Sequence, residues 1–73
     1  MINKYFQIER KNIVTVQFII EGYGRMATVS TVDIQKAIVR ISIMPDFLPE
    51  IDGLLKELQL KYSMKNVSDH REN

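Results

Sequence analysis

The sequence predicts a small α+β domain of two layers, in the order strand, helix, strand, strand, helix. Two observations predict it. Apolar and polar residues alternate over three short stretches, as in strands with one buried face. Two other stretches repeat their apolar residues with the period of a helix. The 73 residues are enough for one small domain, and 45% of them are hydrophobic, which is ordinary for a globular chain.

The composition of the chain excludes several classes of function. There is no cysteine, so disulfides and thiolate metal sites are excluded. A domain of this size buries only roughly 60% of its unfolded surface and usually needs further stabilisation, so we expect a partner subunit. The net charge of +1 provides no general attraction to nucleic acid or anionic lipid. No apolar run approaches the ~20 residues that span a bilayer, and the first residues lack a signal-peptide pattern, so we expect a cytoplasmic protein.

The first strand is predicted at Lys4–Glu9, where Phe6 and Ile8 alternate with Tyr5 and Gln7. A polar break follows and ends at residue 12.

The first helix is predicted at Ile13–Tyr23, with Asn12 as its N-cap. Five apolar residues share one face, namely Ile13, Val16, Ile19, Ile20 and Tyr23. Val14 and Phe18 form a second stripe, which indicates that the helix is covered on more than one side. The glycines at the end of this stretch are a usual helix stop.

A hairpin is predicted next. Met26–Val32 and Ala37–Ile43 both alternate, and Asp33 favours the first position of a type I turn between them. The last helix follows Pro45, with Asp46 as its cap. Its apolar face is Phe47, Leu48, Ile51, Leu54, Leu55, Leu58 and Tyr62. Residues 63–73 form a polar tail for which no regular structure is expected, although Lys65–Ser68 could add a short strand.

This order is that of a ferredoxin-like sandwich lacking its last strand, with an antiparallel sheet ordered 1-3-2 and both helices on one face. The first strand would then be an open edge with no inward charge to protect it, and we expect it to pair with a second copy or with the tail. The predicted oligomer interface comprises Phe6, Ile8, Val14 and Phe18. The uncovered face of the sheet would carry Tyr5, Gln7, Thr28, Ser30, Arg40 and Ser42.

The stretch Glu21-Gly22-Tyr23-Gly24-Arg25 is the one candidate ligand site. Tyr23 could form a wall, Arg25 could bind a carboxylate or phosphate, and Glu21 could pair with Arg25 or Arg40. The alternative is an ordinary helix end, with a glycine in the left-handed conformation and Tyr23 packed on the core.

No catalytic residue, metal site or cofactor is predicted. Asp46, Glu50 and Asp52 lack the spacing of a calcium loop, and His70 has no partner that would make it a ligand or a positioned base. The hydroxyl groups on the strands have no basic partner that would activate them.

Three motifs together resemble a family of small bacterial proteins known only as a domain of unknown function. They are Glu21-Gly22-Tyr23, the run Thr28-Val29-Ser30-Thr31-Val32-Asp33, and Pro45-Asp46-Phe47 at the head of the last helix. The resemblance covers most of Tyr5 to Leu58 and implies a bacterial origin and no particular activity. The fold order is also similar to that of ACT domains, which bind amino acids at subunit interfaces. Those domains have a glycine-containing turn where this chain has Glu9-Arg10-Lys11-Asn12.

The leading hypothesis is a non-enzymatic, homodimeric interaction or regulatory module. A small-ligand sensor of the ACT kind, with a pocket at the subunit interface near Tyr23 and Arg25, is the alternative. A weak single-stranded RNA binder that uses the sheet face is the third. A membrane is not expected as a partner. A nucleic acid ranks below a second copy and a small molecule, and the identity of a small-molecule ligand is left open.

Overall fold

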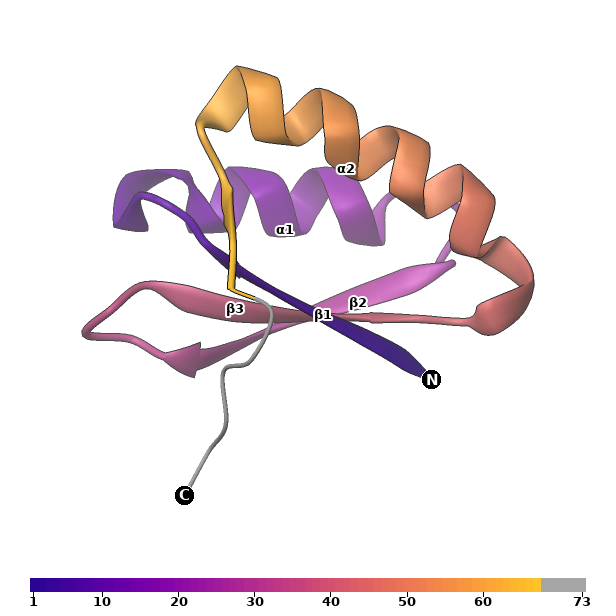
Figure 1. Ribbon diagram of the computed structural model, residues 1–73, viewed down its shortest axis with the longest axis horizontal. Coiled ribbons are helices and arrows are strands. Elements are labelled where there is room, and N and C mark those ends of the chain that lie inside the picture. Colours follow the sequence, from indigo (N-terminus) through magenta and orange to yellow (C-terminus); the bar gives the residue numbers. More distant parts are fainter. Residues whose placement is uncertain (68–73) are drawn as a thin grey trace.

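The computed structural model describes residues 1–67 as a two-layer α+β sandwich. The order of elements is β1 (Ile2–Gln7), η1 (Arg10–Asn12), α1 (Ile13–Glu21), β2 (Ala27–Asp33), β3 (Ile38–Ile43), η2 (Pro45–Phe47), α2 (Leu48–Tyr62) and β4 (Lys65–Asn66). The strands form one antiparallel sheet in the order β2-β3-β1-β4. Both helices cover the same face of this sheet, and the other face is not covered by a helix (Figure 1).

The predicted element order and the placement of β3 between β2 and β1 are confirmed. The prediction that the last strand is missing was wrong. Lys65–Asn66 forms β4 and pairs with Phe6 and Gln7 of β1, and the Val67 amide donates to the Tyr5 carbonyl oxygen at 2.8 Å. Met64 is buried, so the fold continues past the end predicted at residue 62. The rest of the expected tail lies outside the described residues.

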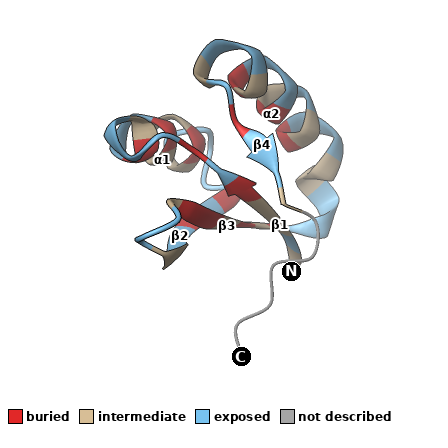
Figure 2. Ribbon diagram, turned by 60° about the vertical axis from the view of Figure 1, so that its left-hand side comes forward, coloured by how far each residue is buried: buried red, intermediate tan, exposed pale blue. Residues whose placement is uncertain are grey.

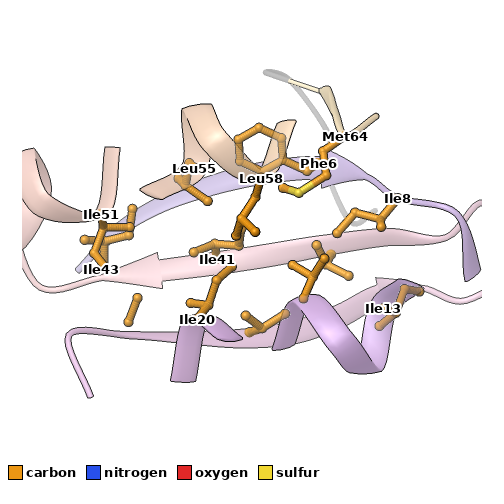
Figure 3. Packing of buried hydrophobic residues seen from close by; sticks show 14 residues of the cluster. Phe6, Ile8, Ile13, Ile20, Ile41, Ile43, Ile51, Leu55, Leu58 and Met64 are labelled. Atoms are coloured by element: carbon orange, nitrogen blue, oxygen red, sulfur yellow. The ribbon is translucent and has the colours of Figure 1, made fainter. Parts of the chain in front are cut away.

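The core lies between the sheet and the two helices and contains no buried polar side chain within residues 1–67. Phe6 and Ile8 enter it from β1 and the segment after β1; Ile41 and Ile43 enter from β3; Ile20 enters from α1, and Ile51, Leu55 and Leu58 from α2 (Figure 3). The apolar faces predicted for the helices therefore point inward, except at Tyr23, which follows the end of α1 and is exposed. The burial of Phe6 and Ile8 at 2% and 1% exposure corrects their assignment to an oligomer interface. Both side chains belong to the core of the single chain.

The position of Lys4 corrects the prediction that the first strand has no inward-pointing charge. Alternation along β1 places Lys4 on the same face as Phe6, so its side chain points toward the helical layer. Its ammonium lies 2.8 Å from the Asp52 carboxylate of α2, and both side chains are about one-third exposed. Inward-pointing charges of this kind discourage a sheet edge from pairing with another chain. Together with β4, Lys4 leaves β1 a poorer pairing edge than the sequence suggested.

The β2–β3 hairpin forms as predicted. The Asp33 side chain accepts a hydrogen bond from the Lys36 amide at 3.0 Å, which holds the turn. Ala37 then adopts φ 56°, and its carbonyl oxygen accepts from the Ile8 amide. The register shifts between Thr31 and Asp33, so a bulge lies near the end of β2. Bulges of this kind also discourage pairing at an edge strand.

The predicted helix caps do not form. Asn12 occupies the N-cap position of α1 without a side-chain hydrogen bond to the helix. Asp46 lies inside η2, and neither η2 nor α2 has a side-chain cap. A short 3-10 turn precedes each helix, and neither Asn12 (φ −99°, ψ −6°) nor Phe47 (φ −111°, ψ 13°) at the N-cap is extended. An N-cap residue needs an extended conformation to turn its side chain back onto the first amides.

Candidate functional site

The most unusual surface of the domain is the side of α1 that faces away from the core. Val14 and Phe18 stand four residues apart, on the same side of the helix, and are 75% and 80% exposed. Lys11 lies one turn before Val14, and Glu21 lies at the C-terminal end of α1. We call Lys11, Val14, Phe18 and Glu21 the α1 outer stripe. The opposite side of the helix, with Ile13, Val16 and Ile20, is buried (Figure 2). The second stripe predicted from the sequence therefore exists, and nothing in the described chain covers it.

Glu21 has a definite role that the sequence did not reveal. One of its carboxylate oxygens accepts a hydrogen bond from the Val29 amide at 3.0 Å. Because β2 is an edge strand, this amide points away from the sheet and would otherwise be open to pairing with another chain. The structure gives Glu21 this contact, whereas the sequence left open a pairing with Arg25 or Arg40. The signal available in the sequence was a glutamate at the end of a helix that is followed by an edge strand.

Replacing Glu21 with alanine is expected to expose the β2 edge. The variant should lose about 1 kcal/mol of stability, since a hydrogen bond to a charged group is lost at a half-buried position. Hydrogen exchange of the Val29 amide should accelerate by about fivefold, the same energy expressed as a rate. Glu57→Ala, at an exposed position of α2, is the control and should leave Val29 unchanged. Equal exchange of Val29 in the two variants would show that the carboxylate does not protect the edge.

The segment after α1 turns sharply. Gly24 has φ 71° and Arg25 has φ 59°, so two consecutive residues are left-handed. A side chain on Gly22 would also place its Cβ 3.0 Å from the Phe18 carbonyl oxygen. The helix-end interpretation is therefore right about the backbone. It was wrong about Tyr23, which is 47% exposed and not part of the core.

A concavity of about 420 Å³ opens beside this turn. It is lined by Gly22, Tyr23, Gly24, Met26 and Glu50. Arg25, which the sequence placed together with Tyr23, is not among these lining residues. Glu50 comes from the first turn of α2, which lies next to the end of α1 (Figure 1). Sequence reasoning missed Glu50 at this site because tertiary packing brings it there. Met26 was missed although it follows Gly24 by only two residues.

The residues predicted on the uncovered sheet face lie there in rows set by the register. Tyr5 is opposite Arg40, which is opposite Ser30, and Ser42 is opposite Thr28. Gln7 donates to the Lys36 carbonyl oxygen at 2.9 Å and so ties β1 to the hairpin turn. Tyr5 is the only aromatic side chain on this face within the described strands.

The three carboxylates considered for a cation are separated. Asp46 lies in η2, Glu50 lines the concavity, and Asp52 pairs with Lys4. No three potential metal ligands converge anywhere in residues 1–67. His70 lies outside the described residues.

The fold and these surfaces define a small β-α-β-β-α-β sandwich domain with an exposed apolar helix face. The chain belongs to the family described as Domain of unknown function (DUF4911), whose model matches residues 6–61. The resemblance inferred from the sequence motifs is thereby confirmed. No curated protein and no solved structure matches the chain. In the part of the chain that is described, no helix has the length and apolar character needed to cross a membrane.

Proposed function

We propose that this domain is a non-enzymatic interaction module of the bacterial cytoplasm that forms a homodimer through the α1 outer stripe. The observation that carries the proposal is the exposure of Val14 and Phe18 on one face of a helix whose other face is core. Isolated exposed apolar residues are common on protein surfaces, but two that lie side by side on a helix form a small contiguous patch.

A second copy is the occupant that fits the stripe, because the stripe is complementary to itself. In a two-fold dimer the same patch meets itself in opposite directions. Val14 and Phe18 flank Val16 symmetrically along the helix, and Lys11 and Glu21 flank it at equal distances further out. An antiparallel pair of α1 helices centred near Val16 therefore places Phe18 against Val14 of the other copy. The same arrangement brings Lys11 to the Glu21 of the other copy.

The charges of the stripe are available for this pairing. The ammonium of Lys11 lies 3.8 Å from the Glu9 carboxylate, and both side chains are mostly exposed, which makes that pair weak. Glu21 uses one carboxylate oxygen for Val29 and retains the other. The interface differs from the one expected at β1, whose edge is partly occupied by β4.

The dimer is expected to be weak. Burying Val14 and Phe18 in both copies contributes roughly 6–12 kcal/mol at about 1.5–3 kcal/mol for each side chain. Association costs several kcal/mol in lost freedom of motion, with estimates beginning at about 4 kcal/mol. With the middle of the burial range and the lowest cost of association, about 5 kcal/mol remain, and a Kd on the order of a few hundred µM follows. Such an affinity suits a transient, concentration-dependent module.

A charge variant tests the antiparallel geometry. Lys11→Glu places a carboxylate against Glu21 of the other copy and should weaken the dimer about fivefold or more, as expected for a close like-charge pair. Lys56→Glu, an exposed position of α2, makes the same charge change outside the interface and should have little effect. The dimer Kd of each variant is measured by sedimentation equilibrium. Equal weakening by both variants would count against the proposed register.

Two other functions predicted from the sequence have less support. Binding of single-stranded RNA is favoured by no specific contact, because base stacking on a sheet uses several aromatic rings and the described strands present one. Recognition of a small ligand is favoured by the concavity at the end of α1. That concavity is formed within one chain, so it does not depend on the dimer.

A further inference from the structure

We infer that the concavity beside Tyr23 binds a small organic cation, namely a protonated amine attached to an apolar body. It has a volume of about 420 Å³ and is shallow and widely open to solvent, so it can hold a small molecule against one side only. It is lined by an aromatic ring, a thioether, two glycines and a single charged group, the Glu50 carboxylate. All of these lining residues come from one chain, so the inferred site does not require the proposed dimer.

The electrostatics of the concavity favour a positive charge. Glu50 is exposed, and no ion pair with another described residue neutralises it. Gly22 and Tyr23 follow directly on α1, so the negative end of that helix dipole lies at the same place. The first turn of α2 brings the opposite partial charge to the same place and offsets that of α1, so the Glu50 carboxylate decides the sign of the charge there. Arg25 is near in sequence but does not line the cavity.

The apolar part of the concavity suits the body of such a ligand. Tyr23 is 47% exposed, so its side chain is accessible to a cation or an alkyl chain. Met26 is half-buried and approaches the backbone of Gly24, so that a Cβ built there would be 3.5 Å from the Met26 methyl carbon. The flexible methionine side chain can adapt to the shape of a guest. The two glycines let a ligand approach the backbone closely.

The three glycines of the chain provide the test. Gly22 and Gly24 line the concavity, whereas Gly53 lies on the exposed surface of α2, with no atom near the position of a Cβ. The ¹⁵N-labelled full chain is titrated with phenethylamine and, separately, with 3-phenylpropanoate, which has a similar body and the opposite charge. The amide signals of Gly22 and Gly24 should shift saturably with the amine. Gly53 should not shift, and the carboxylate should have no effect.

Two variants locate the contacts. Glu50→Gln and Tyr23→Leu are each expected to weaken the binding of phenethylamine by about two- to fivefold, the strength of one exposed ion pair or cation–π contact. Glu57→Gln removes a charge from the same helix outside the cavity and should leave the affinity unchanged. Circular dichroism confirms that each variant is folded. The inference is overturned if phenethylamine shifts no glycine, if it shifts Gly53 equally, or if the carboxylate binds as well as the amine. It is also overturned if Glu57→Gln weakens binding as much as Glu50→Gln.

Discussion

Phe6→Ala is expected to reduce the free energy of unfolding by about 3–5 kcal/mol, the cost of leaving a cavity where a large core side chain has been removed. Phe6 is 2% exposed and lies with Leu58 and Met64 between β1 and α2 (Figure 3). A chain of this length has a total stability of roughly 5–10 kcal/mol. The variant should therefore be marginally folded and unfold at a much lower urea concentration than the wild type.

Phe18→Ala is the matched control for this prediction. The same truncation at 80% exposure should change monomer stability by about 0.5 kcal/mol or less. The two urea transitions are compared at a protein concentration well below the dimer Kd, so that self-association does not contribute. If Phe6→Ala were no more destabilising than Phe18→Ala, the placement of Phe6 in the core would be wrong. The earlier assignment of Phe6 to an interface would then be preferred.

Phe18→Asp is expected to have the largest effect on self-association. A two-fold interface loses two phenylalanine side chains and gains two carboxylates near its centre. Loss of the two rings alone corresponds to about 3–6 kcal/mol, which is a weakening of at least about 100-fold. The monomer should remain folded because Phe18 makes little contact with its own chain.

A second exposed apolar residue separates this effect from a general loss of hydrophobic surface. Leu60 is 88% exposed on α2, on the side away from the core, as its position on the helical wheel predicts. Leu60→Asp should leave the dimer Kd unchanged. Sedimentation equilibrium of both variants gives the comparison. Dissociation by Leu60→Asp, with Phe18→Asp still dimeric, would move the interface from α1 to α2.

Periodicity in the sequence was sufficient for the main elements of the fold. The alternation in β2 and β3 and the apolar faces of α1 and α2 reflect which side of each element is buried. The pattern and the structure therefore agree. Strand β4 was only an option because two residues, Lys65 and Asn66, have no period. Their pairing depends on β1, which lies some sixty positions earlier in the chain.

The parts of the candidate site that were missed depend on tertiary contacts. Lys4 looked like a polar residue at the end of a strand, and only the position of Asp52 on α2 makes it an inward ion pair. The partner of Glu21 is a backbone amide. Every residue except proline has such an amide, so no residue type in the sequence indicates this partner. Glu50 lines the same concavity as Tyr23 only because the start of α2 lies near the end of α1. By contrast, the exposed stripe of Val14 and Phe18 was visible from helical spacing alone.

The mass of the wild-type chain in solution decides whether the chain forms a dimer through the α1 outer stripe. Light scattering after size exclusion is run over a dilution series from well above to well below the expected Kd, together with Phe18→Asp at the same concentrations. Dimerisation through the α1 outer stripe predicts a wild-type mass that rises from one chain toward two with increasing concentration, while Phe18→Asp stays at one chain throughout. A wild type that remains at the mass of one chain at the highest concentration, or a Phe18→Asp variant that dimerises equally well, would contradict it.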